Sequence, residues 1–185
     1  MKKIISRSIL CATLLMGSIF ATSCDSETIA AIIAQLLNTG TTYTFSGTGN
    51  AASLIGTGTN TDGSYNYASD GTGTVQTNIQ VSVASSGSTA TMVIPSFKCG
   101  SFTMSQVTFS NLVLSTNGNY NTLSVGESSS ADGSITYNSQ TYDVCNLYIE
   151  CKLNDSEIII SSMSIYFGDE KYVINLPFSG KVVTQ

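Results

Sequence analysis

Residues 145–153 read CNLYIECKL, and this stretch decides the fold class. Apolar and polar residues alternate along it without a break. Cys145, Leu147, Ile149, Cys151 and Leu153 take one parity, and Asn146, Tyr148, Glu150 and Lys152 take the other. Successive side chains of a β-strand point to opposite faces. The stretch therefore predicts a strand with one buried face and one exposed face.

Two further strands follow it toward the C-terminus. Asn154-Asp155 leads into the alternating run Ile158–Phe167, and Gly168-Asp169 leads into Tyr172–Phe178. Short turns between alternating runs are typical of hairpins. The three runs predict an antiparallel meander that shares one buried face.

The alternation also extends toward the N-terminus. Val75–Val83 and Ala90–Ile94 each keep one parity of apolar residues. Phe102–Leu114 changes parity between Phe109 and Leu112, which predicts one longer strand or a bulged pair. Together the runs predict an all-β fold, either a small antiparallel β-barrel or a β-sandwich. The side chains expected in its core are Val81, Val83, Ile94, Leu147, Ile149, Cys151, Ile165 and Ile174.

Residues 40–74 are rich in Gly, Ser and Thr and contain three Gly-Thr-Gly triplets. A phosphate-binding loop requires a helix directly after its glycines, and no helical pattern follows these. We expect twisted or edge strands joined by loose turns. Asp62-Gly63 and Asp70-Gly71 are turn signals, and they enclose Tyr65 and Tyr67.

The N-terminal residues resemble an export signal. A basic start at Met1–Arg7 precedes an apolar run over Ile9–Phe20, and Ala21-Thr22-Ser23 then leads to Cys24. The pattern predicts a lipoprotein signal peptide over residues 1–23 and lipidation of Cys24. An ordinary secretory signal is the alternative. Lipidation implies a protein anchored to the outer membrane through its N-terminal lipid, on the periplasmic or the cell-surface side.

Residues 24–40 are predicted to hold the lipid anchor, a linker and one short N-terminal helix. Apolar residues recur at helical spacing in Thr28–Leu37, and the stretch has no Lys or Arg. We expect this helix to pack on the β structure. Residues 41–185 are then the β-barrel domain, a single domain by length.

The charge of the chain excludes one class of partner. Twelve acidic residues follow Cys24 but only four lysines do, which leaves a formal charge of −8. Nucleic-acid binding requires a basic surface. We expect no nucleic-acid partner.

Catalytic constellations are missing from the sequence. The chain has no histidine, which removes Ser-His and Cys-His nucleophiles and histidine metal ligands. Asp143 and Glu150 have opposite strand parity, so a carboxylate pair is not predicted there. The sequence predicts a protein that is not an enzyme, with no cofactor and no metal.

Three cysteines lie within the β domain. Cys145 and Cys151 are six residues apart on one strand and cannot pair with each other. Cys99 is able to pair with either one if the strands are neighbours, which export permits. The alternative is three buried thiols that act as small apolar residues.

The pattern as a whole resembles the calycin-like β-barrel lipoproteins of gut Bacteroidetes. The resemblance covers residues 41–183. The segments that carry it are the lipid-anchored start, Ala90–Phe97, Phe102–Leu114, Asp132-Gly133 and Ile158–Phe178. It implies a small barrel behind a lipid anchor, and it assigns no catalytic residues.

Two hypotheses of function follow. The first is a non-enzymatic binding module that holds a small apolar ligand inside the barrel, in a cavity of about 300–1,000 Å³. The second is a structural or adhesive surface lipoprotein that contacts glycans or host proteins. In the second, Tyr65, Tyr67 and Tyr148 are candidates to stack on sugars.

Overall fold

The computed structural model describes residue 40 and residues 42–183. The signal peptide, Cys24 and the helix predicted at Thr28–Leu37 lie outside the described residues. Within them the protein is all-β, as the sequence predicts, with thirteen strands in one antiparallel sheet. The described part contains no helix with the length and apolar character needed to span a membrane.

The strands differ widely in length. They are β1 (Thr42–Thr59), β2 (Tyr65–Val83), β3 (Thr89–Ile94), β4 (Phe97–Cys99), β5 (Phe102–Met104), β6 (Val107–Asn117), β7 (Tyr120–Ser124), β8 (Ser130–Asp132), β9 (Ser134–Tyr137), β10 (Gln140–Leu153), β11 (Glu157–Phe167), β12 (Tyr172–Asn175) and β13 (Phe178–Val182).

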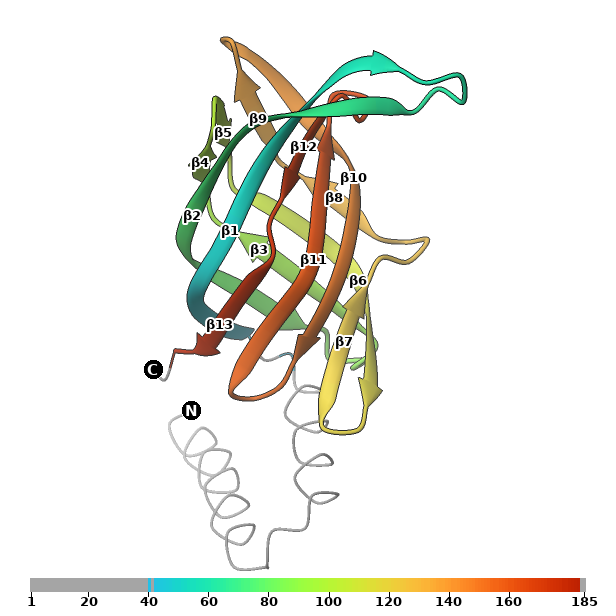
Figure 1. The fold of residues 1–185 in the computed structure, drawn as a ribbon. Helices are drawn as coiled ribbons and strands as arrows, with labels where there is room; N and C mark the ends of the chain where they lie inside the picture. The colour runs from blue at the N-terminus through green and yellow to red at the C-terminus, as the bar shows by residue number, and fades with distance from the viewer. Residues whose placement is uncertain (1–39, 41, 184–185) are drawn as a thin grey trace, which may run out of the picture.

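The last strands of the chain pair with the first strand, so that the order of pairing forms a closed cycle. β1, β2, β3, β6, β7, β10 and β11 pair in this order, and β12 and β13 each pair with both β11 and β1. The strands therefore curl into a ring (Figure 1). This ring favours the barrel form of the predicted fold. β4, β5 and β9 pair with one another toward the upper end of the ring in Figure 1.

Large apolar side chains line the inside of the ring. All eight positions predicted for the core are buried, from Val81 to Ile174. Phe45, Phe102, Phe109 and Phe167 are fully buried beside them. These buried side chains belong to one hydrophobic core cluster.

An aromatic cluster lies where β5, β9, β10 and β12 come together. Tyr172 is 4.4 Å from the ring of Tyr142 and 5.8 Å from that of Phe102, measured between centroids. Tyr137 contacts Tyr172 at 5.4 Å. Burial, with a hydrogen bond to Tyr142, raises the pKa of Tyr172 to about 12. The cluster joins the β4–β5–β9 sheet to β12.

The predicted bulge in Phe102–Leu114 is present. Asn111 is exposed with φ of 57°, and the register of β3 against β6 shifts between Ala90 and Met92. Phe109 and Leu112 are consequently both buried. The change of parity read in the sequence is confirmed as a local insertion.

A second bulge was not predicted, and it corrects the placement of Cys145. The register of β10 against β11 shifts between Val144 and Asn146. The strand therefore has one parity before Cys145 and the other after it. Cys145 is exposed rather than buried.

The Gly-rich segment forms a long hairpin instead of loose edge strands. β1 and β2 pair almost residue by residue, from Thr42 with Ser82 to Thr59 with Tyr65. Asp62-Gly63 is the predicted turn, but Asp70-Gly71 lies inside β2. The prediction of a turn at Asp70 is therefore wrong.

Asp70 has a structural role in β2. Its Oδ2 atom accepts a hydrogen bond from the Ser101 backbone N–H at 2.7 Å and one from the Ser53 hydroxyl at 3.1 Å. Gly71 and Gly100 lie against each other at the same point. Asp70 therefore attaches the β4–β5 turn to the long hairpin.

Candidate functional site

The wall of the ring is not paired everywhere along β10. One edge of β10 pairs with β11 over most of its length. The other edge pairs with β9 at Gln140–Asp143 and with β7 at Cys151–Leu153. Residues 144–150 have no strand partner on that edge within the described sheet. The wall therefore has a gap between β10 and β8.

At this gap a backbone N–H group of β10 finds its hydrogen-bond acceptor within β10 itself. The Leu147 N–H donates to the Asn146 side-chain oxygen at 2.8 Å. The amide nitrogen of Asn146 donates to Glu170 Oε1 at 2.9 Å. Asn146 thus supplies the acceptor that a neighbouring strand would normally supply.

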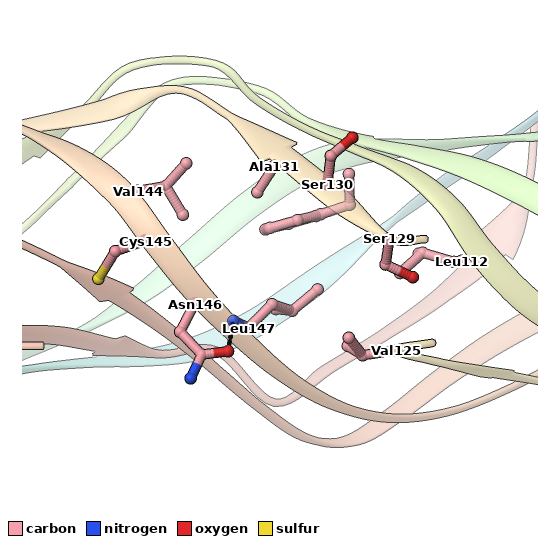
Figure 2. A pocket seen from close by; sticks show the side chains of 10 residues that line it. Leu112, Val125, Ser129, Ser130, Ala131, Val144, Cys145, Asn146 and Leu147 are labelled. Carbon is pink, nitrogen blue, oxygen red and sulfur yellow. Dashed lines mark hydrogen bonds between the residues drawn. The ribbon is translucent and has the colours of Figure 1, made fainter. Parts of the chain in front are cut away.

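A pocket of about 150 Å³ lies at the gap (Figure 2). Its lining comes from β6, β8, β10 and the segment that precedes β8. The lining residues are Phe109, Leu112, Val125, Ser129, Ser130, Ala131, Val144, Cys145, Asn146 and Leu147. Most of the side chains from β6, β8 and β10 are apolar.

The polar groups of the lining largely have partners within the protein. The Ser129 hydroxyl donates to the Asn111 carbonyl at 2.8 Å and accepts from the Gly126 N–H at 2.9 Å. Asn146 is bonded at both ends of its amide. In Figure 2 the Cys145 thiol and the Asn146 nitrogen lie on the side of β10 away from Ala131. The pocket can therefore offer a ligand apolar contact and few hydrogen bonds.

All three described cysteines are free thiols. Neither Cys99–Cys145 nor Cys99–Cys151 is formed as a disulfide. Cys99 and Cys151 are buried, and burial raises the pKa of both, that of Cys151 to about 12. Cys145 borders the pocket and is exposed, so the three are not alike as the sequence alternative supposed.

The candidate tyrosines lie on two strands, β2 and β10. Tyr65 and Tyr67 are ring neighbours on β2, with centroids 6.2 Å apart. The Tyr67 hydroxyl donates to the Glu170 carbonyl at 2.6 Å. Tyr148 lies on β10 and donates to Glu150 at 2.7 Å, which raises the pKa of its hydroxyl. The hydroxyls of Tyr67 and Tyr148 thus already have partners within the protein.

The two acidic residues of β10 lie far apart on its exposed face. Asp143 and Glu150 are both exposed, because the bulge at Cys145 changes the parity between them. The prediction that they face opposite sides is therefore wrong. They are seven residues apart on an extended strand, about 23 Å. In the part of the chain that the structure describes, no group of His, Cys, Asp and Glu is placed to hold a metal ion.

Comparisons with known proteins give no match: no family model, no curated protein and no solved structure resembles the chain significantly. The pocket is therefore interpreted from its own geometry. Sequence reasoning did not find it, because its lining comes from distant segments and depends on an unpredicted bulge. Alternation placed Leu147 on the buried face of its strand, but it placed Val144 with Asn146 on the opposite, exposed face.

Proposed function

We propose that this protein is a non-enzymatic binding module of the cell envelope, and that it holds an apolar group of a small ligand in the pocket between β8 and β10. The pocket with its apolar lining is the observation that carries the proposal. The lipid anchor predicted at Cys24 completes it by holding the module at a membrane.

The volume of the pocket limits the ligand. A pocket for a whole drug-sized molecule measures about 300–1,000 Å³. A volume of 150 Å³ equals that of an engineered apolar cavity that binds benzene, although this pocket is partly open to solvent and partly lined by polar groups. The proposed ligand is therefore an aromatic ring or a branched chain end, bound within the wall of the ring. It replaces the larger ligand inside the barrel that the sequence suggested.

The lining is also unfavourable for a polar group of the ligand. Burying an uncompensated polar group costs free energy, because it loses its hydrogen bonds to water. Ser129 and Asn146 are bonded within the protein and offer little compensation. An apolar group meets no such cost and gains contact with Phe109, Leu112 and Leu147.

Benzene is the probe for the first test. Its titration into the purified full chain should shift the methyl NMR signals of Leu112, Val144 and Leu147. Ala131→Leu places a larger side chain in the pocket and should abolish these shifts. Ala68→Leu makes the same change at an exposed position of β2 and should leave them unchanged.

Two results would contradict the proposal. One is saturable benzene binding that Ala131→Leu leaves intact in a folded protein, since the ligand would then occupy another place. The other is the absence of any shift in the wild-type methyl signals at saturating benzene.

A further inference from the structure

A second hollow lies on the long hairpin, apart from the pocket at β8 and β10. Its volume is about 680 Å³. Its lining comes from β1, from β2 and from the link between β3 and β4. The lining residues are Ser46, Gly47, Thr48, Gln76, Thr77, Asn78, Pro95 and Ser96. We call this hollow the hairpin trough.

The trough lies where β3 leaves β2. β2 pairs with β3 only from Gln80 to Val83, and β3 ends at Ile94 before Pro95. Proline has no N–H to continue the ladder. Residues 76–78 of β2 therefore pair with β1 alone within the described sheet. Separation of the strands leaves the space that the trough occupies.

The side chains of the trough are neutral and polar. Ser46 and Thr48 contribute hydroxyls, and they pair across the strands with Asn78 and Gln76, which contribute amides. All four are exposed. None of the four side chains has a hydrogen-bond partner among the described residues, in contrast to Ser129 and Asn146 at the other pocket.

This chemistry selects a class of ligand. An anionic ligand would be expected to meet Lys or Arg, and the lining contains no charged residue. An apolar ligand would require an apolar lining, and Pro95 alone provides one. Each amide offers both donors and an acceptor, and each hydroxyl offers both as well. A neutral molecule with many hydroxyl groups satisfies such a set.

We propose that the hairpin trough binds a neutral oligosaccharide. The trough is widely open to solvent, so it would contact one side of a ligand that lies along the strands. The cross-strand pairs Ser46–Asn78 and Thr48–Gln76 place two amides on neighbouring positions of one strand face, where they can bond to successive hydroxyls. An extended peptide is the weaker candidate, because strand addition relies on pockets for alternate side chains. This inference does not depend on the proposed apolar site.

Neutral trisaccharides are the probes: cellotriose, maltotriose and tri-N-acetylchitotriose. Each is titrated into the full chain at millimolar concentrations while backbone NMR signals are recorded. At least one should shift the signals of residues 46–48 and 76–78 in a saturable way. Trigalacturonate, the anionic comparator, should bind more weakly.

Matched variants locate the binding. The double variant Gln76→Ala/Asn78→Ala should weaken the bound trisaccharide roughly thirtyfold, because two hydrogen-bonding amides are lost. Gln80→Ala removes an exposed amide of the same face of β2 outside the trough and should bind as the wild type does. Circular dichroism checks that both variants keep their β structure.

Several outcomes would overturn the inference. They are the absence of trough shifts with all three trisaccharides, tighter binding of trigalacturonate, and equal losses in the double variant and Gln80→Ala. Shifts at the trough with a neutral Ser/Thr-rich peptide but with none of the sugars would identify a peptide site instead.

Discussion

Burial of the Cys151 thiol makes the stability of the protein decrease as the pH rises in the alkaline range. Burial raises the pKa of its thiol from about 9 to about 12. The unfolded chain therefore releases this proton first as the pH rises. The stabilisation is complete below pH 9 and decreases toward pH 12, by about 1.4 kcal/mol per pH unit at most. Urea unfolding at pH 8 and pH 10 measures the decrease.

Cys151→Ala is the comparison for that experiment. The variant lacks the thiol, so its free energy of unfolding should decrease less between the two pH values, although it is lower at both. Other titrating groups, Tyr172 included, remain in both proteins and cancel in the difference. An identical decrease in both proteins would show that Cys151 does not titrate in this way.

Ile149 tests the buried face of β10. Its side chain is 5% exposed, whereas that of its neighbour Tyr148 is 49% exposed. Ile149→Ala should lower the free energy of unfolding by about 2–5 kcal/mol, because it removes buried methyl groups. Tyr148→Ala should cost much less. Chemical denaturation measures both, and a smaller loss at Ile149 than at Tyr148 would reverse the assignment of the faces.

At this scale the sequence predicts burial well wherever the strand continues regularly. All eight expected core residues are buried, because strict alternation leaves only one face for the apolar side chains. Cys145 and Asp143 were misplaced because a bulge is determined by how β10 pairs with β11. The only sign of it in the residues of β10 is the change of apolar parity between Val144 and Leu147.

Asp70 connects two elements, and a matched pair of substitutions measures the connection. Asp70 and Asp62 each accept one backbone N–H and one hydroxyl. The partners of Asp62 belong to Ser64 in the same exposed turn, whereas those of Asp70 belong to other strands or turns. Asp70→Ala should cost about 1.5–3 kcal/mol in unfolding free energy, as expected for hydrogen bonds to a charged group. Asp62→Ala should cost much less, because the Asp62 side chain is exposed and its partners lie in the same turn.

Amide hydrogen exchange adds a local readout to this comparison. The Ser101 N–H should exchange faster in Asp70→Ala, because this variant lacks its acceptor. Its exchange rate should be unchanged in Asp62→Ala. Equal protection of Ser101 in both variants would mean that the β4–β5 turn is held by other contacts.

The limits of sequence reasoning at the element scale are clear from this hairpin. The turn at Asp62-Gly63 was predicted correctly, but Asp70-Gly71 has the same residues and lies within a strand. The difference arises from Ser101 and Gly100, which are distant in sequence and meet Asp70 only in the folded protein. Local turn preference was overridden by a tertiary contact.

The ring as a whole depends on close contact between β1 and β13. Gly47 pairs with Gly180, and a Cβ atom on Gly47 would overlap the backbone of Ser179 and Gly180. Gly47→Ala should therefore destabilise the protein by about 3 kcal/mol or more, since neither strand can move away freely. Gly73→Ala is the control, because a Cβ there meets no atom within 4 Å. Thermal unfolding should show a large loss for the first and little change for the second.

The fold class was predictable, but the ring and the pocket were not. Alternation identifies strands and turns, and these indicate an antiparallel all-β protein. It does not indicate that β1 pairs with β13, because that choice depends on a contact between the two ends of the domain. The pocket depends in turn on which strands fail to pair. The lipid anchor at Cys24 and the calycin-like resemblance remain predictions.

Closure of the ring by β1 and β13 also has a consequence for synthesis. During synthesis, β1 and β2 are complete long before residues 178–182 are made. One edge of β1 therefore stays unpaired until β13 has been synthesised. Unpaired strand edges can pair with other chains and cause aggregation, especially when they are apolar and lack glycine. Residues 44–50 read TFSGTGN. The glycines and hydroxyl side chains make this edge a poor template for aggregation until β13 has been synthesised.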